Sequence, residues 1–194
     1  MICPVQILGS DGSGSNSGVI SGINFVVGKC KGAAFRCVIN MSIGGGFNSQ
    51  LNSAVATAVD NGIVVVVAAG NDYANNACNY SPSSAAKAVT VGSTTSSDAK
   101  SDFSNIGSCV DVYAPGSDIK SAYISSNTAT KTMSGTSMAT PRTFVSLFSI
   151  ALSIIYGHVV HTLPHCHSRS LLFRCCWHGS DYTRSRSFAY SSSG

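Results

Sequence analysis

The sequence predicts an α/β fold with a parallel β-sheet. Segments typical of strands alternate with segments typical of helices along most of the chain, which is the pattern of repeated strand–helix–strand units. The segment Ile63–Ala69 is a continuous apolar run rich in β-branched residues, as expected for a strand that is buried on both faces. Glycine-rich loops follow the predicted strands after Leu8, Met41 and Val67. Because ligands of such folds collect where loops leave the carboxyl ends of strands, we expect the functional site at these loops.

Each element has its own local signal. Two segments have apolar residues at helical spacing, Gly18–Val27 and Leu51–Asn61, and Asn61-Gly62 is a typical helix end. Short apolar runs bounded by turn residues predict the strands. The expected strands are Val5–Leu8, Val38–Ser42, Ile63–Ala69, Ala88–Val91 and Val110–Tyr113. From Arg142 onward this alternation stops, and His, Cys, Arg and Ser cluster without a period.

The charge distribution separates the chain into two parts. Residues 1–141 hold seven Lys or Arg and seven Asp, whereas residues 142–194 hold five Arg and one Asp, which accounts for the whole net charge of +4. A polyanion-binding function would depend on the Ser- and Arg-rich tail alone, and an unstructured basic end is the simpler interpretation. We expect no nucleic-acid partner and no membrane partner. The apolar run at residues 144–160 is interrupted by serines and His158, which is typical of a buried helix.

The eight cysteines do not show the spacing of a CxxC zinc site. Their number suits a secreted, oxidised protein, yet Met1–Gln6 has neither the basic nor the long apolar region of a signal peptide. The compartment of this chain therefore stays open. The tail gathers several possible metal ligands, but chance enrichment is the simpler interpretation because no regular pattern aims them at one point. These residues are His158, His161, His165, Cys166 and His167.

The segment Gly135–Pro141 carries the strongest chemical signal. A serine becomes a useful nucleophile only when a base takes its proton, and the oxyanion formed by its attack needs hydrogen-bond donors aimed at it. Ser137 precedes helix-forming residues, so we expect it at a helix N-terminus, where free N–H groups favour negative charge. Taken alone, Gly-Thr-Ser is also the sequence of an ordinary helix N-cap.

Several motifs, taken together, resemble those of the subtilisin-like serine peptidases (subtilases), in particular the proteinase K and aqualysin branch. The resemblance covers about residues 5–141 and corresponds to roughly the C-terminal half of that family's catalytic domain. The segments that carry it follow the family's order: Gln6–Gly14, Ser17–Ile23, Asn40–Gly45, Ala68–Asn71, Asn79–Pro82, Phe103–Asn105, Ala114–Gly116 and Gly135–Pro141. It implies the C-terminal part of a three-layer α/β domain with a parallel sheet, incomplete in this chain and followed by an unrelated tail.

The resemblance also implies roles at the matching positions. Ser137 is the expected nucleophile, and its own N–H and the side chain of Asn71 are the expected oxyanion donors. The backbone edges at residues 12–14 and 42–44 are expected to hold a peptide or protein substrate as an added strand. The implied substrate-binding residues are Gly12, Ser13, Gly14, Ser42, Ile43, Gly44, Ala69 and Gly70. Ordinary tight turns would show the same glycines, and an Asn after a Gly is common in turns.

Two further features follow from the resemblance, and no cofactor is expected for the reaction itself. Ala86, Ala88 and Asp111 match positions that bind a structural calcium in the proteinase K branch, the first two through their carbonyl oxygens. The alternative is that Asp111 is simply solvated. Cys78 and Cys109 match a disulfide of the aqualysin type, with two free buried thiols as the alternative. Members of the family are mostly secreted.

The chain departs from the family pattern in two places. The family uses Asp, His and Ser in that chain order, but all five histidines follow Ser137, and no Asp lies in the family's Asp motif. We therefore expect that the chain begins inside the domain and is inactive in isolation. After Pro141 the resemblance ends between two adjacent residues. Residues 1–141 are thus interpreted as a partial peptidase domain, and residues 142–194 as a non-homologous tail that is disordered or translated out of frame.

Three functions stay open at this point. The first is a serine endopeptidase by descent, for which the chain supplies the nucleophile and the oxyanion donors. The second is a non-catalytic module that keeps the peptide groove without the base that activates Ser137. The third is metal or polyanion binding, which only the tail supports.

Overall fold

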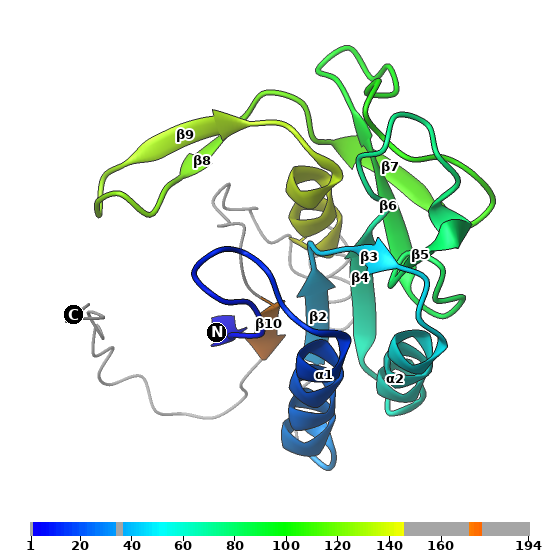
Figure 1. Ribbon diagram of the computed structural model, residues 1–194. Coiled ribbons are helices and arrows are strands. Elements are labelled where there is room, and N and C mark those ends of the chain that lie inside the picture. The colour runs from blue at the N-terminus through cyan, green and yellow to red at the C-terminus, as the bar shows by residue number, and fades with distance from the viewer. Residues whose placement is uncertain (1, 34–36, 146–170, 176–194) are drawn as a thin grey trace, which may run out of the picture.

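The computed structural model describes residues 2–33, 37–145 and 171–175, and a six-stranded sheet with the order β1-β10-β2-β4-β6-β7 forms its centre (Figure 1). The strands are β1 (Ile2–Val5), β2 (Cys37–Met41), β4 (Val64–Ala68), β6 (Val89–Thr94), β7 (Val112–Pro115) and β10 (Leu171–Cys175). The pairs β2–β4, β4–β6 and β6–β7 are parallel, whereas β10 is antiparallel to both of its neighbours. The predicted α/β fold with a parallel sheet is confirmed.

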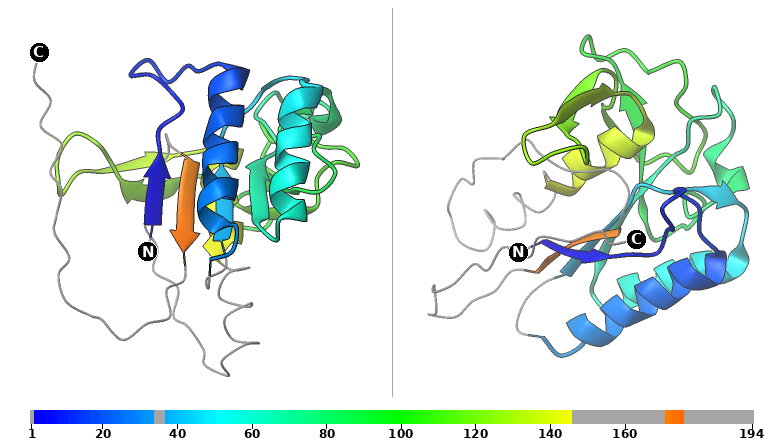
Figure 2. Two further views of the ribbon diagram at one scale, coloured as in Figure 1. Left: turned by 90° about the horizontal axis from the view of Figure 1, so that it is seen from below. Right: turned by 60° about the vertical axis from the view of Figure 1, so that its left-hand side comes forward.

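Helices cover both faces of the sheet. The helices α1 (Asn16–Cys30) and α2 (Ser49–Asp60) lie on one face, and the helix at residues 136–145, called the Ser137 helix below, lies on the other (Figure 2). Successive side chains of a strand point to opposite faces. In β4, Val65 and Val67 therefore pack with α1 and α2, while Val66 packs with the Ser137 helix. This two-sided burial explains why β4 is a continuous valine run.

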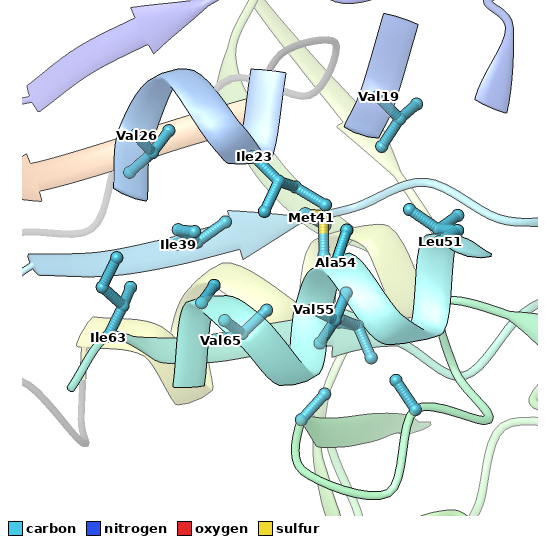
Figure 3. Packing of buried hydrophobic residues seen from close by; sticks show 14 of the residues in the cluster. Val19, Ile23, Val26, Ile39, Met41, Leu51, Ala54, Val55, Ile63 and Val65 are labelled. Atoms are coloured by element: carbon cyan, nitrogen blue, oxygen red, sulfur yellow. The ribbon is translucent and has the colours of Figure 1, made fainter. Parts of the chain in front are cut away.

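The larger core lies between the sheet and the helices α1 and α2 (Figure 3). Ile23 of α1, Val55 of α2 and Ile39 and Met41 of β2 are all fully buried there. Burying one such side chain stabilises a fold by about 1.5–3 kcal/mol. The smaller core on the opposite face seats the Ser137 helix on the sheet. Its buried members are Val38, Val66, Val91, Ala114, Ala139 and Phe144.

Both long helices begin earlier than the apolar pattern predicted, because polar caps precede their first buried residue. The Oγ of Ser15 accepts a hydrogen bond from the Gly18 N–H (3.1 Å) at the start of α1. The Oδ1 of Asn48 accepts one from the Leu51 N–H (2.8 Å) at the start of α2. Such caps satisfy N–H groups that the first helical turn leaves free.

The predicted strand Val5–Leu8 is wrong, since β1 ends at Val5. Ile7 is apolar for another reason: it packs against α1, where a Cβ on Gly22 would overlap the Cγ2 of Ile7. An apolar residue that packs on a helix from a loop cannot be distinguished by periodicity from a strand residue. The four other predicted strands overlap β2, β4, β6 and β7.

Several elements were not predicted. The small pair β3 (Gly45–Gly46) and β5 (Tyr80–Ser81) and the hairpin β8 (Ile119–Ala122) and β9 (Thr130–Met133) lie outside the main sheet, and η1 (Ala77–Asn79) is a short 3₁₀ helix. The strand β10 belongs to the tail, where we predicted no strand, and it lies between β1 and β2. Apart from β10, the tail beyond Val145 lies outside the described residues. That part includes most of the apolar run at 144–160 and the His- and Cys-rich cluster at 158–167.

Among the residues that the structure describes, two disulfides connect elements near the sheet. One joins Cys30 at the end of α1 to Cys37 at the start of β2, and it was not predicted. The other joins Cys78 to Cys109, the pair that the resemblance implies. Within the described ranges, Cys3 is an exposed free cysteine. No helix in those ranges has the length and apolarity needed to cross a membrane.

Candidate active site

Ser137 lies in the first turn of its helix, at the edge where the parallel strands end. The turn before it is anchored because the Gly135 N–H donates to the Gly116 O (2.9 Å), directly after β7. The Gly135 O then accepts from the Met138 N–H (3.0 Å), which starts the helix. Since the first N–H groups of a helix have no partner within it, the N–H of Ser137 is available as a donor toward a ligand.

The hydroxyl of Ser137 is paired with the loop that follows β2. Ser137 Oγ donates to the Ser42 O (3.3 Å), and Ser42 Oγ donates to the Ser137 O (3.0 Å). The Nδ2 of Asn40 donates to Ser42 Oγ (3.1 Å) and extends this chain of hydrogen bonds into the sheet. Asn40 is only 2% exposed. The nucleophile expected from the sequence therefore lies against the expected substrate-binding loop.

Asn71, the expected oxyanion donor, is tied to the residue just before Ser137. Its Oδ1 accepts from the N–H (2.8 Å) and from the Oγ1 hydroxyl (2.9 Å) of Thr136. The Thr136 Oγ1 in turn accepts from the Gly70 N–H (3.2 Å). Because both bonds use the oxygen end of the Asn71 carboxamide, its Nδ2 remains able to donate. Thr136 is fully buried. Thr136 was not among the predicted site residues, although it lies inside the Gly135–Pro141 motif.

These residues border one open pocket of about 330 Å³. Seven of the predicted site residues line it: Ser42, Ile43, Gly44, Ala69, Gly70, Asn71 and Ser137. The other lining residues were not among the predicted site residues, although Gly45, Ala68, Tyr80 and Thr136 lie within segments that resemble the family; they are Gly45, Gly46, Ala68, Asp72, Tyr80, Ser83 and Thr136. The fold thus brings together loops that follow β2, β4 and β9, which are far apart in the sequence. The consecutive glycines at residues 44–46 leave room on one wall for the backbone or a side chain of a ligand.

Gly12, Ser13 and Gly14 are exposed and are not among the residues that line this pocket. They lie in a tight loop between β1 and α1, in which the Gly9 N–H donates to the Ser13 O (2.8 Å). The Oδ1 of Asp11 accepts from the Ser13 N–H (3.0 Å). This backbone hydrogen bond holds the pKa of Asp11 below its ordinary value. A role of this loop in substrate binding stays a prediction.

The expected calcium ligands lie at the other end of two neighbouring strands. Ala86 and Ala88 precede β6, Asp111 precedes β7, and β6 pairs with β7. Two hydrogen bonds join Asp111 and Thr90. The Asp111 N–H donates to the Thr90 O (2.9 Å), and the Thr90 N–H donates to Asp111 Oδ2 (2.8 Å). One carboxylate oxygen of Asp111 is therefore engaged in the fold. The other oxygen of Asp111, like the carbonyl oxygens of Ala86 and Ala88, is of the type that a hard cation prefers.

The part of the chain that the structure describes contains no histidine. Within it, the hydroxyl of Ser137 is hydrogen-bonded to a backbone carbonyl oxygen, that of Ser42, rather than to an imidazole. In the same part there is also no cluster of three or more His, Cys, Asp or Glu side chains that could hold a metal ion. The chemistry available at the pocket is thus a hydroxyl, two candidate N–H donors and open backbone edges.

The comparisons with known proteins agree with this geometry. Residues 1–146 match the family model described as the subtilase family. Subtilisin-like protease 2 of Pseudogymnoascus destructans is 58% identical over 137 residues, which are 71% of this chain and 34% of the relative. The extracellular serine proteinase of Thermus sp. is 53% identical over 138 residues, which are 71% of this chain and 33% of the relative. The chain thus spans about a third of the length of these relatives.

A solved structure is similar as well. The crystal structure of a cold-adapted subtilisin-like serine proteinase matches 77% of this chain and 52% of its own, with a TM-score of 0.68 and 48% identity. The likeness therefore includes both sequence and fold.

Proposed function

This chain belongs to the subtilase family, and we propose that it supplies the nucleophile and the oxyanion donors of a serine endopeptidase. The observation that carries this proposal is the convergence of Ser137 and Asn71 on one pocket. Two hydrogen bonds from Thr136, the neighbour of Ser137, fix the carboxamide of Asn71. Acyl transfer requires a nucleophile and, beside it, an oxyanion donor whose position is already fixed.

In the proposed reaction, a peptide or protein substrate lies along the backbone edge at residues 42–44 as an added strand, and residues 12–14 form the second edge. Ser137 Oγ bonds to the carbonyl carbon, its proton passes to a general base, and the carbonyl oxygen becomes an oxyanion. That oxyanion accepts from the Ser137 N–H and from Asn71 Nδ2. Collapse of the adduct expels the amine of the broken peptide bond, which takes up the proton from the general base. The acyl group left on Ser137 is then removed by water as a free carboxylic acid.

We further propose that the chain in isolation does not hydrolyse peptides. All five histidines follow Ser137 in the sequence, whereas the family places its His before the Ser. Without a base, the hydroxyl of Ser137 keeps its proton, which it donates to the Ser42 O. The alternative function is a non-catalytic peptide-binding module, and the absence of histidine before Ser137 is the observation that favours it.

A fluorophosphonate probe distinguishes these functions. Labelling forms a bond from Ser137 Oγ to phosphorus, releases fluoride and transfers the proton to a base, so it reports an activated serine. For the purified 194-residue chain we expect no label at Ser137, together with binding of an uncleavable peptide measured by calorimetry. Label that disappears in Ser137→Ala would contradict the proposed inactivity and support an active peptidase. Failure to bind any peptide of a varied library would contradict the proposed groove.

Three ancillary proposals follow. A calcium ion bound by the carbonyl oxygens of Ala86 and Ala88 and by the carboxylate of Asp111 would stabilise the start of β6 and β7 without taking part in the reaction. The two disulfides support an oxidising compartment. We expect peptide or protein partners rather than nucleic acid or membrane, because residues 1–141 have no net charge.

A further inference from the structure

The turn that carries Asn71 is held by a residue outside the pocket, Asn105, which is fully buried. Its Nδ2 donates to the Ala69 O and to Asp72 Oδ2, each at 3.1 Å. Its Oδ1 accepts from the Asp72 N–H (2.9 Å), and its own N–H donates to the Gly70 O (3.0 Å). These four hydrogen bonds fall on both sides of Asn71, and none of them involves Asn71 itself.

The contact between Asn105 and the turn is close as well as polar. Gly70 has a φ of +103°, and a Cβ at this position would overlap the Nδ2 of Asn105. The turn therefore requires glycine both for its backbone conformation and for the space that Asn105 fills. A buried carboxamide in such a place is stable only when its polar atoms are hydrogen-bonded, which ties the position of the turn to that of Asn105.

The segment around Asn105 also supports the residues that follow the turn. Tyr73 and Ala74 have φ values of 53° and 66°, in the left-handed region that non-glycine residues seldom adopt. The Tyr73 N–H donates to the Phe103 O (3.2 Å), and the Ala74 N–H donates to the Ser104 O (3.3 Å). Backbone strain of this kind persists only where surrounding contacts fix it.

We propose that Asn105 is a positioning residue for the oxyanion donor. Asn105 fixes the backbone on both sides of Asn71, and Thr136 fixes the Oδ1 of Asn71, so that its Nδ2 is held toward the space beside Ser137. Donors of this kind are effective because they do not have to reorganise when negative charge develops. The inference rests on the proposed function, and it concerns tetrahedral anionic adducts of Ser137 rather than peptide binding in general.

Two ligands that differ only at the reacting group separate positioning from a merely structural role. A peptide boronic acid adds to Ser137: the Oγ–B bond forms, the hydroxyl proton leaves to the buffer, and the tetrahedral boron becomes negative with an oxygen directed at the donors. The matching peptide amide binds the same groove without this oxyanion. A structural role of Asn105 would weaken the binding of both ligands alike, whereas positioning would weaken the binding of the boronic acid selectively.

In the 194-residue chain, we expect Asn105→Ala to raise the Kd of the boronic acid about 10- to 100-fold relative to that of the amide, since loss of one oxyanion donor costs roughly 10²–10³ in rate. The control is Val26→Ala, which removes a buried side chain of α1 from the larger core and destabilises the fold away from the pocket. We expect it to leave the ratio of the two Kd values unchanged. An unchanged ratio in Asn105→Ala would overturn the proposal.

A second measurement does not depend on the proposed function. In ¹⁵N-labelled protein, we expect the side-chain NH₂ resonances of Asn71 to shift and broaden in Asn105→Ala. A second variant serves if Asn105→Ala does not fold. Asp72→Ala removes only the bond from Asn105 Nδ2 to Asp72 Oδ2, at an exposed residue, and we expect it to shift the Asn71 resonances as well, by a smaller amount. Unchanged Asn71 resonances in these variants would overturn the role of Asn105. If the wild-type chain binds neither peptide ligand, the proposed function fails, and the resonances still decide the role of Asn105.

Discussion

Ser42 and Ser137 exchange hydrogen bonds in both directions, each through its hydroxyl to the carbonyl oxygen of the other. Pro141 explains one of the two bonds. In a regular helix the N–H of residue 141 would donate to the Ser137 O, but proline has no N–H. Ser42 Oγ takes the place of that donor. The sequence from Ser137 to Pro141 thus leaves a carbonyl oxygen that only a distant loop satisfies, and this requirement fixes the loop beside the nucleophile.

We predict that Ser42→Ala lowers the free energy of unfolding by about 1–2 kcal/mol, because the half-buried Ser137 O is left without a donor. Pro141→Ala restores an N–H at the position from which a helix would serve that oxygen. In urea unfolding, the cost of Ser42→Ala should therefore be smaller in the Pro141→Ala background. Equal costs in the two backgrounds would show that Pro141 and Ser42 are independent.

Gly70→Ala should destabilise the chain by about 1–3 kcal/mol, because a side chain at this φ is strained and overlaps Asn105. Two other glycines serve as controls. Gly62 has a φ of +80° but open space around its Cβ position, so Gly62→Ala should show the backbone cost alone. Gly28 lies within α1 with open space, so Gly28→Ala should stabilise by about 0.5–1 kcal/mol. In thermal unfolding, Gly28→Ala should therefore be the most stable of the three variants and Gly70→Ala the least stable. Any other order would contradict this interpretation.

Calcium should raise the melting temperature of the wild-type chain if the proposed site exists. A ligand at 100 times its Kd stabilises by about 2.7 kcal/mol. Asp111→Asn keeps an acceptor for the Thr90 N–H but removes the charge, so this variant should lose the response to calcium. Asp98→Asn changes an exposed turn residue outside the proposed ligand set, so this variant should keep the response to calcium. A response that survives in Asp111→Asn would place the ion elsewhere.

The turn at Asp11 should weaken at acid pH. The Ser13 N–H donates to the Asp11 carboxylate, which lowers the pKa of Asp11 in the folded chain below its ordinary value of 3.8. The ionised carboxylate therefore contributes its stabilisation above the ordinary pKa, and the contribution is lost as the pH falls through the lowered pKa. The amide resonance of Ser13 should titrate with a midpoint below 3.8. It should not titrate in Asp11→Asn, and a midpoint above that value would refute the assigned cause.

The two disulfides should contribute unequally. In the chain-entropy model, a link across a longer loop removes more freedom from the unfolded chain. Cys30 and Cys37 are separated by 7 positions, and Cys78 and Cys109 by 31. Removing the first pair by Cys30→Ser and Cys37→Ser should cost about 2.5 kcal/mol, and removing the second about 3.7 kcal/mol. The reverse order in urea unfolding would indicate that effects in the folded state dominate.

The sequence predicted the features that depend on local patterns. The valine run of β4 and the start of the Ser137 helix (residues 136–145) each have a strong local signal, and the motif around Asn71 is one of those that resemble the subtilases. The missed features depend on contacts between distant positions. Asn105 acts on Asp72 across 33 positions, and only the fold shows that these residues meet.

The error at the start of the sheet has a similar cause. Ile7 is apolar because Gly22 leaves space for it on α1, a pairing that periodicity cannot reveal. The strand β10 carries an apolar signal at Leu171–Phe173, yet this short run is surrounded by residues without any period. The hairpin of β8 and β9 lies outside the main sheet and has few buried residues, so its sequence shows little alternation.

The position of β10 sets an order in which this chain can fold. Ile2 of β1 pairs with Arg174, and Cys37 of β2 pairs with Cys175, so neither neighbour of β10 can complete its pairing until residues 171–175 have been synthesised. The pairs β2–β4 and β4–β6 join nearer segments and can form while the ribosome is still translating the tail. Pairing across such sequence distances is slow because a long loop must close first. During synthesis, the outer edge of β2 is therefore open to the strands of other chains.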